Sequence, residues 1–198
     1  MPGKSTLLSM HGVNNMTARN EGYLYLISFI LTIPLANWMI GNVGTVCPEK
    51  NPCLLPVGFE IFAPSGVLMV GIALVLRDLV QRRLGRNWAL GAIVAGACLS
   101  ALIAPAALVM ASGVAFFVSE LADFAVYTPL QKKRFVTAVI LSSLVGLVVD
   151  SLLFLYLAFG SLDYLGGQII GKAWMVLLAL PLIWWLRWRD QKLGYTSA

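Results

Sequence analysis

Long apolar runs follow one another along most of the chain, and short polar or basic segments separate them. A helix that crosses a bilayer needs about 20 predominantly apolar residues, and the runs have roughly this length. The pattern predicts six helices, at residues 23–41, 61–80, 88–103, 106–127, 135–159 and 168–186. We therefore expect an all-α integral membrane protein, a six-transmembrane-helix bundle that forms a single domain.

Both ends of the chain lie outside this pattern. Residues 1–22 are polar and lack the apolar core of a signal peptide. We expect them to form a flexible cytoplasmic tail, residues 23–190 to form the six-helix domain, and residues 191–198 to form a C-terminal cytoplasmic tail.

Composition and charge agree with a membrane protein. The 198 residues are 59% hydrophobic and only 12% charged, which excludes an ordinary soluble domain. Basic residues gather in the two tails and in alternate loops: Lys4, Arg19, Arg82, Arg83, Arg86, Lys132, Lys133, Arg134, Arg187, Arg189 and Lys192. One further basic residue, Lys50, falls in a loop of the opposite side. This asymmetry predicts that both termini are cytoplasmic, and it accounts for the basic charge without a nucleic-acid partner.

Charged residues also interrupt the apolar runs themselves. Four are acidic (Asp78, Glu120, Asp123 and Asp150) and two are basic (Arg77 and Lys172). A charge at the bilayer centre costs about 2.5–3.5 kcal/mol on insertion scales, so such residues usually face the bundle interior and are often functional. We expect a buried polar site in which acids outnumber bases.

The fourth predicted helix carries two of these acids beside aromatic residues. Four residues share one of its faces: Phe116, Glu120, Asp123 and Tyr127. Carboxylates accept paired hydrogen bonds and aromatic rings stack on heterocycles, so this face suits a planar ligand with N–H donors. Alternatively, Asp123 pairs with Lys132 or Arg134 at the membrane surface.

On the fifth predicted helix, Ser143, Asp150 and Phe154 form a similar stripe, and Asp150 is expected near the middle of the bilayer. It is the strongest site candidate, and the alternative is a structural ion pair with Lys172 or Arg77.

On the sixth predicted helix, Gln168 and Lys172 share a face, although Lys172 could instead extend outward to the surface. In the second, the neighbours Arg77 and Asp78 point about 100° apart. Asp78 is the expected inward member, and Arg77 could reach the headgroups.

Other chemistry is sparse. Cys47 and Cys53 flank a short loop and could form a disulfide in an oxidising compartment, but two unpaired thiols fit the sequence equally well. The chain has no nucleotide-binding fingerprint, and its one histidine lies in the N-terminal tail. We therefore expect no enzyme activity, no cofactor and no metal.

Several motifs resemble one family, the queuosine-precursor transporters, also called the vitamin uptake transporter family. They are LRDLVQRRLG at residues 76–85, SELAD at 119–123, SLVGLVVDS at 143–151 followed by Phe154, and Lys172 followed by an apolar run to Pro181. The resemblance covers about residues 60 to 190. It implies import of a 7-deazaguanine base, such as 7-cyano-7-deazaguanine or 7-aminomethyl-7-deazaguanine, across the plasma membrane (the inner membrane of a bacterium).

This reading assigns roles to the candidates. Asp150, with Glu120 or Asp123, would bind the guanine edge, and Phe116 and Phe154 would stack on the ring. Acceptor atoms of the base would meet Lys172, Gln168 or Ser143. Asp78 completes the candidate site. Transport would proceed by alternating access, and a homodimer is compatible with the sequence.

Three alternatives stay open: a substrate-binding component of an energy-coupling vitamin importer, a non-transporting membrane scaffold, and an enzyme.

Overall fold

The computed structural model describes residues 4–47, 52–58, 60–104 and 108–193, with side chains from Ala18 onward. These residues form six helices and a two-stranded antiparallel sheet: α1 (Lys4–Asn42), β1 (Leu54–Gly58), β2 (Ile61–Pro64), α2 (Val67–Leu84), α3 (Arg86–Ile103), α4 (Val109–Leu130), α5 (Phe135–Phe159) and α6 (Leu165–Leu193).

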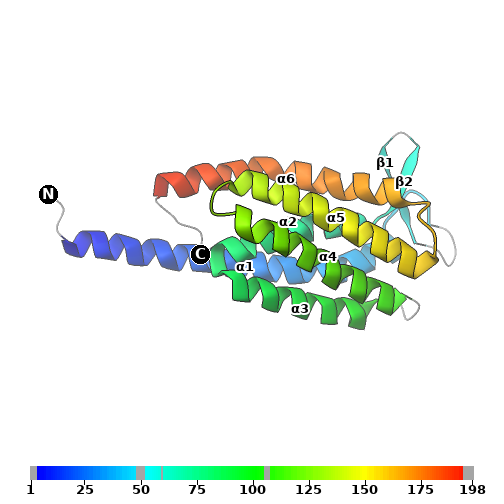
Figure 1. Ribbon diagram of the computed structural model, residues 1–198, viewed down its shortest axis with the longest axis horizontal. Helices are drawn as coiled ribbons and strands as arrows, with labels where there is room; N and C mark the ends of the chain where they lie inside the picture. Colours follow the sequence, from blue (N-terminus) through cyan, green and yellow to red (C-terminus); the bar gives the residue numbers. More distant parts are fainter. Residues whose placement is uncertain (1–3, 48–51, 59, 105–107, 194–198) are drawn as a thin grey trace.

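The helices lie side by side along one long axis, and the first turns of α1 extend beyond the rest of the bundle (Figure 1). The two strands lie at one end, beside the start of α6, and we call this the hairpin end. Arg82, Arg83 and Arg189 lie at the other end, which we call the basic end. Since the basic residues gather there, it is the end that the sequence predicts to be cytoplasmic.

Five helices in the described part of the chain are long and apolar enough to cross a membrane, namely α1 from Ala18, α3, α4, α5 and α6. Large apolar side chains such as Leu102, Met110 and Leu178 are more than two-thirds exposed, as expected for a surface in contact with lipid. These features are typical of a multi-pass membrane protein. A sixth span at α2 and the cytoplasmic position of the termini stay predictions.

The helix α2 is 18 residues long and carries four charged residues, Arg77, Asp78, Arg82 and Arg83. Arg77 and Asp78 are fully buried and Arg82 is nearly so, and all three are held in ion pairs. The helix ends at Gly85, whose φ of 93° is accessible to glycine at little cost, and α3 begins at the next residue.

Three sequence-based expectations differ from the structure. The sixth helix, predicted at 168–186, extends to Leu193 and so includes residues 191–193 of the expected C-terminal tail. Residues 4–22, expected as a flexible tail, continue α1 as helix. The predicted second helix at 61–80 begins only at Val67, since residues 61–64 form β2 and pair with β1. The all-α prediction therefore missed a hairpin, whereas the fifth helix has the predicted bounds of 135–159.

The hairpin is fastened to the helices in several ways. A disulfide joins Cys47, which follows α1, to Cys53, which precedes β1. The indole Nε1 of Trp174 on α6 donates to the carbonyl of Val57 at 2.9 Å. Gly167 lies so close to Phe62 that a Cβ there would clash with the Phe62 carbonyl oxygen. The hairpin is thus held against α6 at one end of the bundle.

Candidate functional site

A cavity lined by residues of all six helices lies in the half of the bundle near the hairpin end. The volume of the cavity is about 90 Å³. Most of its lining is apolar, and its polar residues are Thr32, Asn37, Ser100, Ser112, Asp150, Gln168 and Lys172. A largely apolar cavity with a few converging polar groups is the usual form of a small-molecule site.

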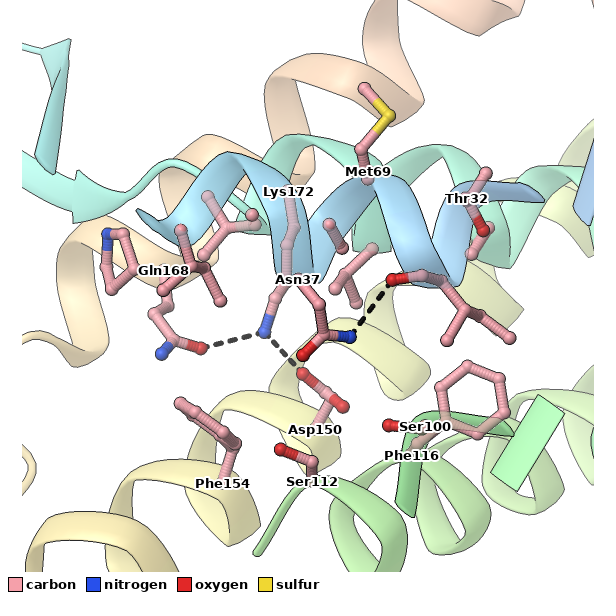
Figure 2. Close-up of a pocket in the computed structure, with 18 residues that line it drawn as sticks. Thr32, Asn37, Met69, Ser100, Ser112, Phe116, Asp150, Phe154, Gln168 and Lys172 are labelled. Atoms are coloured by element: carbon pink, nitrogen blue, oxygen red, sulfur yellow. Dashed lines mark hydrogen bonds and ion pairs between the residues drawn. The ribbon is translucent and has the colours of Figure 1, made fainter. Parts of the chain in front are cut away.

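An ion pair between α5 and α6 forms one wall of the cavity (Figure 2). The Nζ of Lys172 donates to Asp150 Oδ2 at 2.6 Å, to Ser151 Oγ at 2.7 Å and to Gln168 Oε1 at 2.9 Å. Gln168 and Lys172 are one helical turn apart on α6, which brings both side chains to the same place. All three ammonium donors are therefore engaged, and the side chain is fixed in position.

The same contacts leave hydrogen-bonding capacity on the neighbours of Lys172. Asp150 Oδ1 accepts only a long bond of 3.4 Å, from Ser119 Oγ, within the described residues. The amide Nε2 of Gln168 makes no hydrogen bond to any residue that the structure describes. The wall thus offers an acceptor and a donor to a ligand.

Two aromatic rings complete the cavity. Figure 2 shows Phe154 and Phe116 on either side of Asp150, from α5 and α4 respectively. Phe116 also packs against Phe29, with ring centroids 6.1 Å apart, and Gly96 leaves room for it. These rings could stack on a planar molecule whose polar edge meets the ion pair.

A second polar group lies deeper in the bundle and does not line the cavity; we call it the Arg77 cluster. The fully buried guanidinium of Arg77 contacts three carboxyl groups and one amide: Asp78 (Nη1 to Oδ1, 2.8 Å), Glu120 (Nε to Oε2, 3.2 Å), Asp123, and Gln81 (Nη1 to Oε1, 3.3 Å). Ser142 on α5 donates to Asp78 Oδ2 at 3.0 Å. The cluster therefore ties α2, α4 and α5 together.

A small residue makes the close approach of these helices possible. A Cβ at Gly146 on α5 would lie 2.7 Å from Leu74 and 3.1 Å from Asp123 Oδ2. Small residues at helix interfaces are a common means of bringing membrane helices together.

A third group closes the basic end, and we call it the basic-end network. Glu21 on α1 pairs with Arg83 at 3.1 Å and with Arg189 at 2.6 Å. Asp190 on α6 pairs with Arg82 and Arg83, each at 2.7 Å. These pairs join α1, α2 and α6, and sequence reasoning did not anticipate them because both acids lie near predicted helix ends.

The structure divides the predicted site residues between these places. Five of them line the cavity, namely Asp150, Lys172, Gln168, Phe116 and Phe154. Three belong to the Arg77 cluster, namely Asp78, Glu120 and Asp123. Ser143 is buried outside the cavity, and its Oγ has no hydrogen-bond partner among the described residues.

Three alternative placements prove wrong. Arg77 does not reach the headgroups, since it is completely buried. Asp123 pairs with Arg77 and not with a basic residue at the membrane surface. Lys172 does not extend outward either, because it is 1% exposed and turns toward Asp150. The alternative ion pair of Asp150 with Lys172 is present, and its members also line the cavity.

Four polar cavity residues were missed: Thr32, Asn37, Ser100 and Ser112. Asn37 projects toward the ion pair in Figure 2, and its amide donates to the carbonyl of Ile33 at 3.0 Å. An asparagine within an apolar run is a usable signal, since its amide must find partners in lipid. Thr32, Ser100 and Ser112 give a weaker signal, because a hydroxyl group can form its hydrogen bond with the backbone of its own helix.

One comparison with known proteins gives a match. Residues 104–186, which contain α4, α5 and most of α6, match the family model described as "Putative vitamin uptake transporter". No curated protein and no solved structure matches the chain. The matched segment contributes Asp150, Lys172, Gln168 and both aromatic rings of the cavity, and in this segment the chain is similar to a family of membrane transporters.

Proposed function

We propose that this chain is a membrane transporter that imports a 7-deazaguanine base, such as 7-cyano-7-deazaguanine or 7-aminomethyl-7-deazaguanine, by alternating access. The observation that carries the proposal is the cavity, in which the Asp150–Lys172 pair and Gln168 lie between two aromatic rings. The match of residues 104–186 to a transporter family and the apolar helices support it.

The donor and acceptor pattern of the cavity suits the polar edge of a guanine-like base. The N1–H and the exocyclic amine of the base are donors, and Asp150 Oδ1 has acceptor capacity to spare. The O6 and the cyano nitrogen are acceptors, which Gln168 Nε2 can meet. Each buried polar group left without a partner costs about 1–3 kcal/mol, so this match also selects the ligand.

The structure changes the roles proposed for two acids. Glu120 and Asp123 are engaged with Arg77 and lie outside the cavity lining, so Asp150 is the acid assigned to the base. Phe116 and Phe154 keep their proposed stacking role. Ser143 is withdrawn as a ligand contact because its side chain does not line the cavity.

Alternating access requires one end of the bundle to be closed while the other is open. The cavity lies toward the hairpin end, whereas the Arg77 cluster and the basic-end network fill the other half with ion pairs. This arrangement supports the proposal, because ion pairs fill the path from the cavity toward the basic end.

Ligand binding to the purified protein tests the proposal. 7-Cyano-7-deazaguanine should raise the unfolding temperature, while guanine and biotin serve as comparison ligands. A ligand at 100 times its dissociation constant adds about 2.7 kcal/mol to the stability of a two-state protein. Asp150→Asn should abolish the shift. The same substitution at the exposed Asp163 should leave it unchanged. Stabilisation by biotin alone, or a full response of Asp150→Asn, contradicts the assignment.

The second candidate is the substrate-binding component of an energy-coupling importer, which would bind the base but need partner subunits to move it. Uptake by this chain alone in liposomes separates the two, because such a component would bind without transporting. A non-transporting scaffold would do neither.

A further inference from the structure

The Arg77 cluster contains more negative than positive groups. Three carboxyl groups, those of Asp78, Glu120 and Asp123, surround one guanidinium, and all four side chains are at most 2% exposed. If every acid were ionised, two negative charges would have no cation beside them. Ionised groups buried in this way either find a counter-charge or take up a proton.

No other cation in the described part of the chain supplies that counter-charge. Lys172 on α6 is bound to Asp150 on α5, and Arg86 on α3 lies against the Phe124 ring with its Cζ 5.5 Å from the centroid. Arg82 on α2 is paired with Asp190. No group of three or more His, Cys, Asp or Glu side chains in the described residues is placed to hold a metal ion. A proton is the remaining neutralising species.

Unsatisfied oxygens within the cluster point to the same species. Asp123 Oδ2 has no hydrogen-bond partner in the described residues, although it is buried. Asp78 Oδ1 likewise accepts no hydrogen bond from a described residue, although it lies 2.8 Å from Arg77 Nη1. A protonated carboxyl group is neutral and becomes a donor, whereas an ionised one leaves such a buried oxygen charged and without a donor. The Tyr127 hydroxyl, also buried and without a described partner, belongs to a ring 5.6 Å from Arg77 Cζ.

We infer that the Arg77 cluster is a proton-binding site, with the Asp78 and Asp123 carboxyl groups as its acceptors, and that it couples transport to a proton gradient. The coupling half of the inference rests on the proposed function, whereas the proton-binding half does not. One proton enters with the substrate from the hairpin end and leaves to the basic end.

A direct structural link joins this site to the cavity. Glu120 in the cluster is the neighbour of Ser119, whose Oγ lies 3.4 Å from Asp150 Oδ1. The cluster and the cavity wall therefore meet on one turn of α4. A change in the charge of the cluster alters the field at Asp150 and the packing of α4 against α5.

The first test detects the bound proton without a substrate. The C=O vibration of a protonated carboxyl group is distinct from that of an ionised one, so infrared spectra of the purified protein at neutral pH should contain the protonated band. Asp123→Asn and Asp78→Asn should each reduce it, and Asp163→Asn should not. Absence of the band in the wild type, or an undiminished band in both cluster variants, overturns the proton site.

The second test measures coupling in liposomes with 7-cyano-7-deazaguanine. A tenfold inward proton gradient should support up to about tenfold accumulation at one proton per substrate, and a protonophore should abolish it. Asp123→Asn should still bind the base and exchange it across the membrane, but should lose the accumulation. Exchange also shows that the variant is folded, and Asp78→Asn repeats the test if it is not.

The outcomes of the two tests are separable. Wild-type protein that neither binds nor exchanges the base contradicts the proposed function, while the infrared band still decides the proton site. Wild-type uptake that ignores the gradient, or accumulation that survives in both cluster variants, overturns the coupling.

Discussion

The side chains of Asp150 and Lys172 serve two purposes, because they hold α5 to α6 and also face the cavity. If Asp150 becomes neutral, the ammonium loses its counter-charge but keeps two neutral acceptors, Ser151 and Gln168. The carboxylate of Asp150 has less support without Lys172, since its other described contact is the long bond from Ser119. The two residues of the pair therefore differ in how well other groups stabilise each of them once its partner is lost.

A comparison of single and double variants separates the structural from the binding role. Removing one partner of a buried ion pair costs about 3–5 kcal/mol, while replacing both is often neutral. We expect Lys172→Met to lower the free energy of unfolding more than Asp150→Asn does, and the double variant to recover most of that loss. Thermal unfolding in detergent measures the stability. All three variants should fail to bind 7-cyano-7-deazaguanine.

Additive stability losses in the double variant would show that the two residues do not act as a pair. Normal binding by the double variant would place the ligand elsewhere. Two exposed residues, Asp163 and Lys192, serve as matched controls: Asp163→Asn and Lys192→Met should change neither stability nor binding.

The sequence indicates the six charged residues buried in the middle of the helices but not which of them meet, and it does not indicate the buried Arg82 and Asp190 of the basic-end network. Asp150 and Lys172 were predicted to face inward, and they do. Arg77 could have been assigned to the membrane surface as readily as to the interior, because its distance from the end of α2 permits both. Its position depends on Glu120 and Asp123, which lie more than 40 residues away in the chain. Only the packing of α2 beside α4 decides it.

At the scale of elements, the contact between α2 and α6 depends on a glycine. A Cβ on Gly71 would lie 2.7 Å from the backbone oxygen of Lys172 and 2.9 Å from Met175 Cβ. The backbone of Lys172 cannot move aside without moving its ammonium in the cavity wall. The position of α6 and the geometry of the site are thus linked.

Replacing Gly71 with alanine should therefore weaken both stability and ligand binding. Overpacking of this kind costs about 1–3 kcal/mol, and thermal unfolding with and without 7-cyano-7-deazaguanine measures both effects. Gly91 on α3 is the matched control, since nothing lies within 4 Å of its Cβ position. Alanine there should be neutral or slightly stabilising because it favours helix. Equal behaviour of the two variants would show that α2 and α6 can separate at no cost.

The sequence predicted a helix correctly where an apolar run is long enough to cross the membrane, and it failed where pairing between strands decides the structure. The run at 135–159 is long, uninterrupted and ends at Gly160 with a φ of 63°, so both of its ends are marked. The segment 61–64 is apolar too, and a short apolar run can be either strand or helix. It becomes a strand because it pairs with residues 54–58, where Leu55 faces Ala63. That pairing leaves no periodic signal in so few residues.

Across the whole molecule, the polar groups form successive layers along the bundle axis. The hairpin lies at one end, followed by the cavity, the Arg77 cluster and finally the basic-end network. Of these layers, only the last joins α1, α2 and α6 by ion pairs between helix ends. We expect it to act as the closure that must break before a ligand can leave toward the basic end.

Labelling of one cavity position from both sides of the membrane tests this closure. Ser112 lines the cavity, and Cys98 is the free cysteine of the described residues, so Ser112→Cys in a Cys98→Ser background provides a single reactive thiol. A membrane-impermeant thiol reagent should reach it from the hairpin end. The base should protect it, because ligand and reagent would occupy the same cavity.

Adding Asp190→Asn to this background should reverse the accessibility. Asp190 lies 2.7 Å from both Arg82 and Arg83, and Asp190→Asn removes the negative charge that lies between these two and Arg189. Repulsion among three cations favours separation of α6 from α2 at that end. Labelling in vesicles of opposite orientation should therefore fall from the hairpin end and rise from the basic end, while Asp163→Asn should change neither. Unchanged labelling from both sides in the Asp190→Asn variant would mean that the basic-end network holds the helices together without controlling access. The closure would then have to lie at the Arg77 cluster, which is the only other layer of ion pairs between the cavity and the basic end in the described structure.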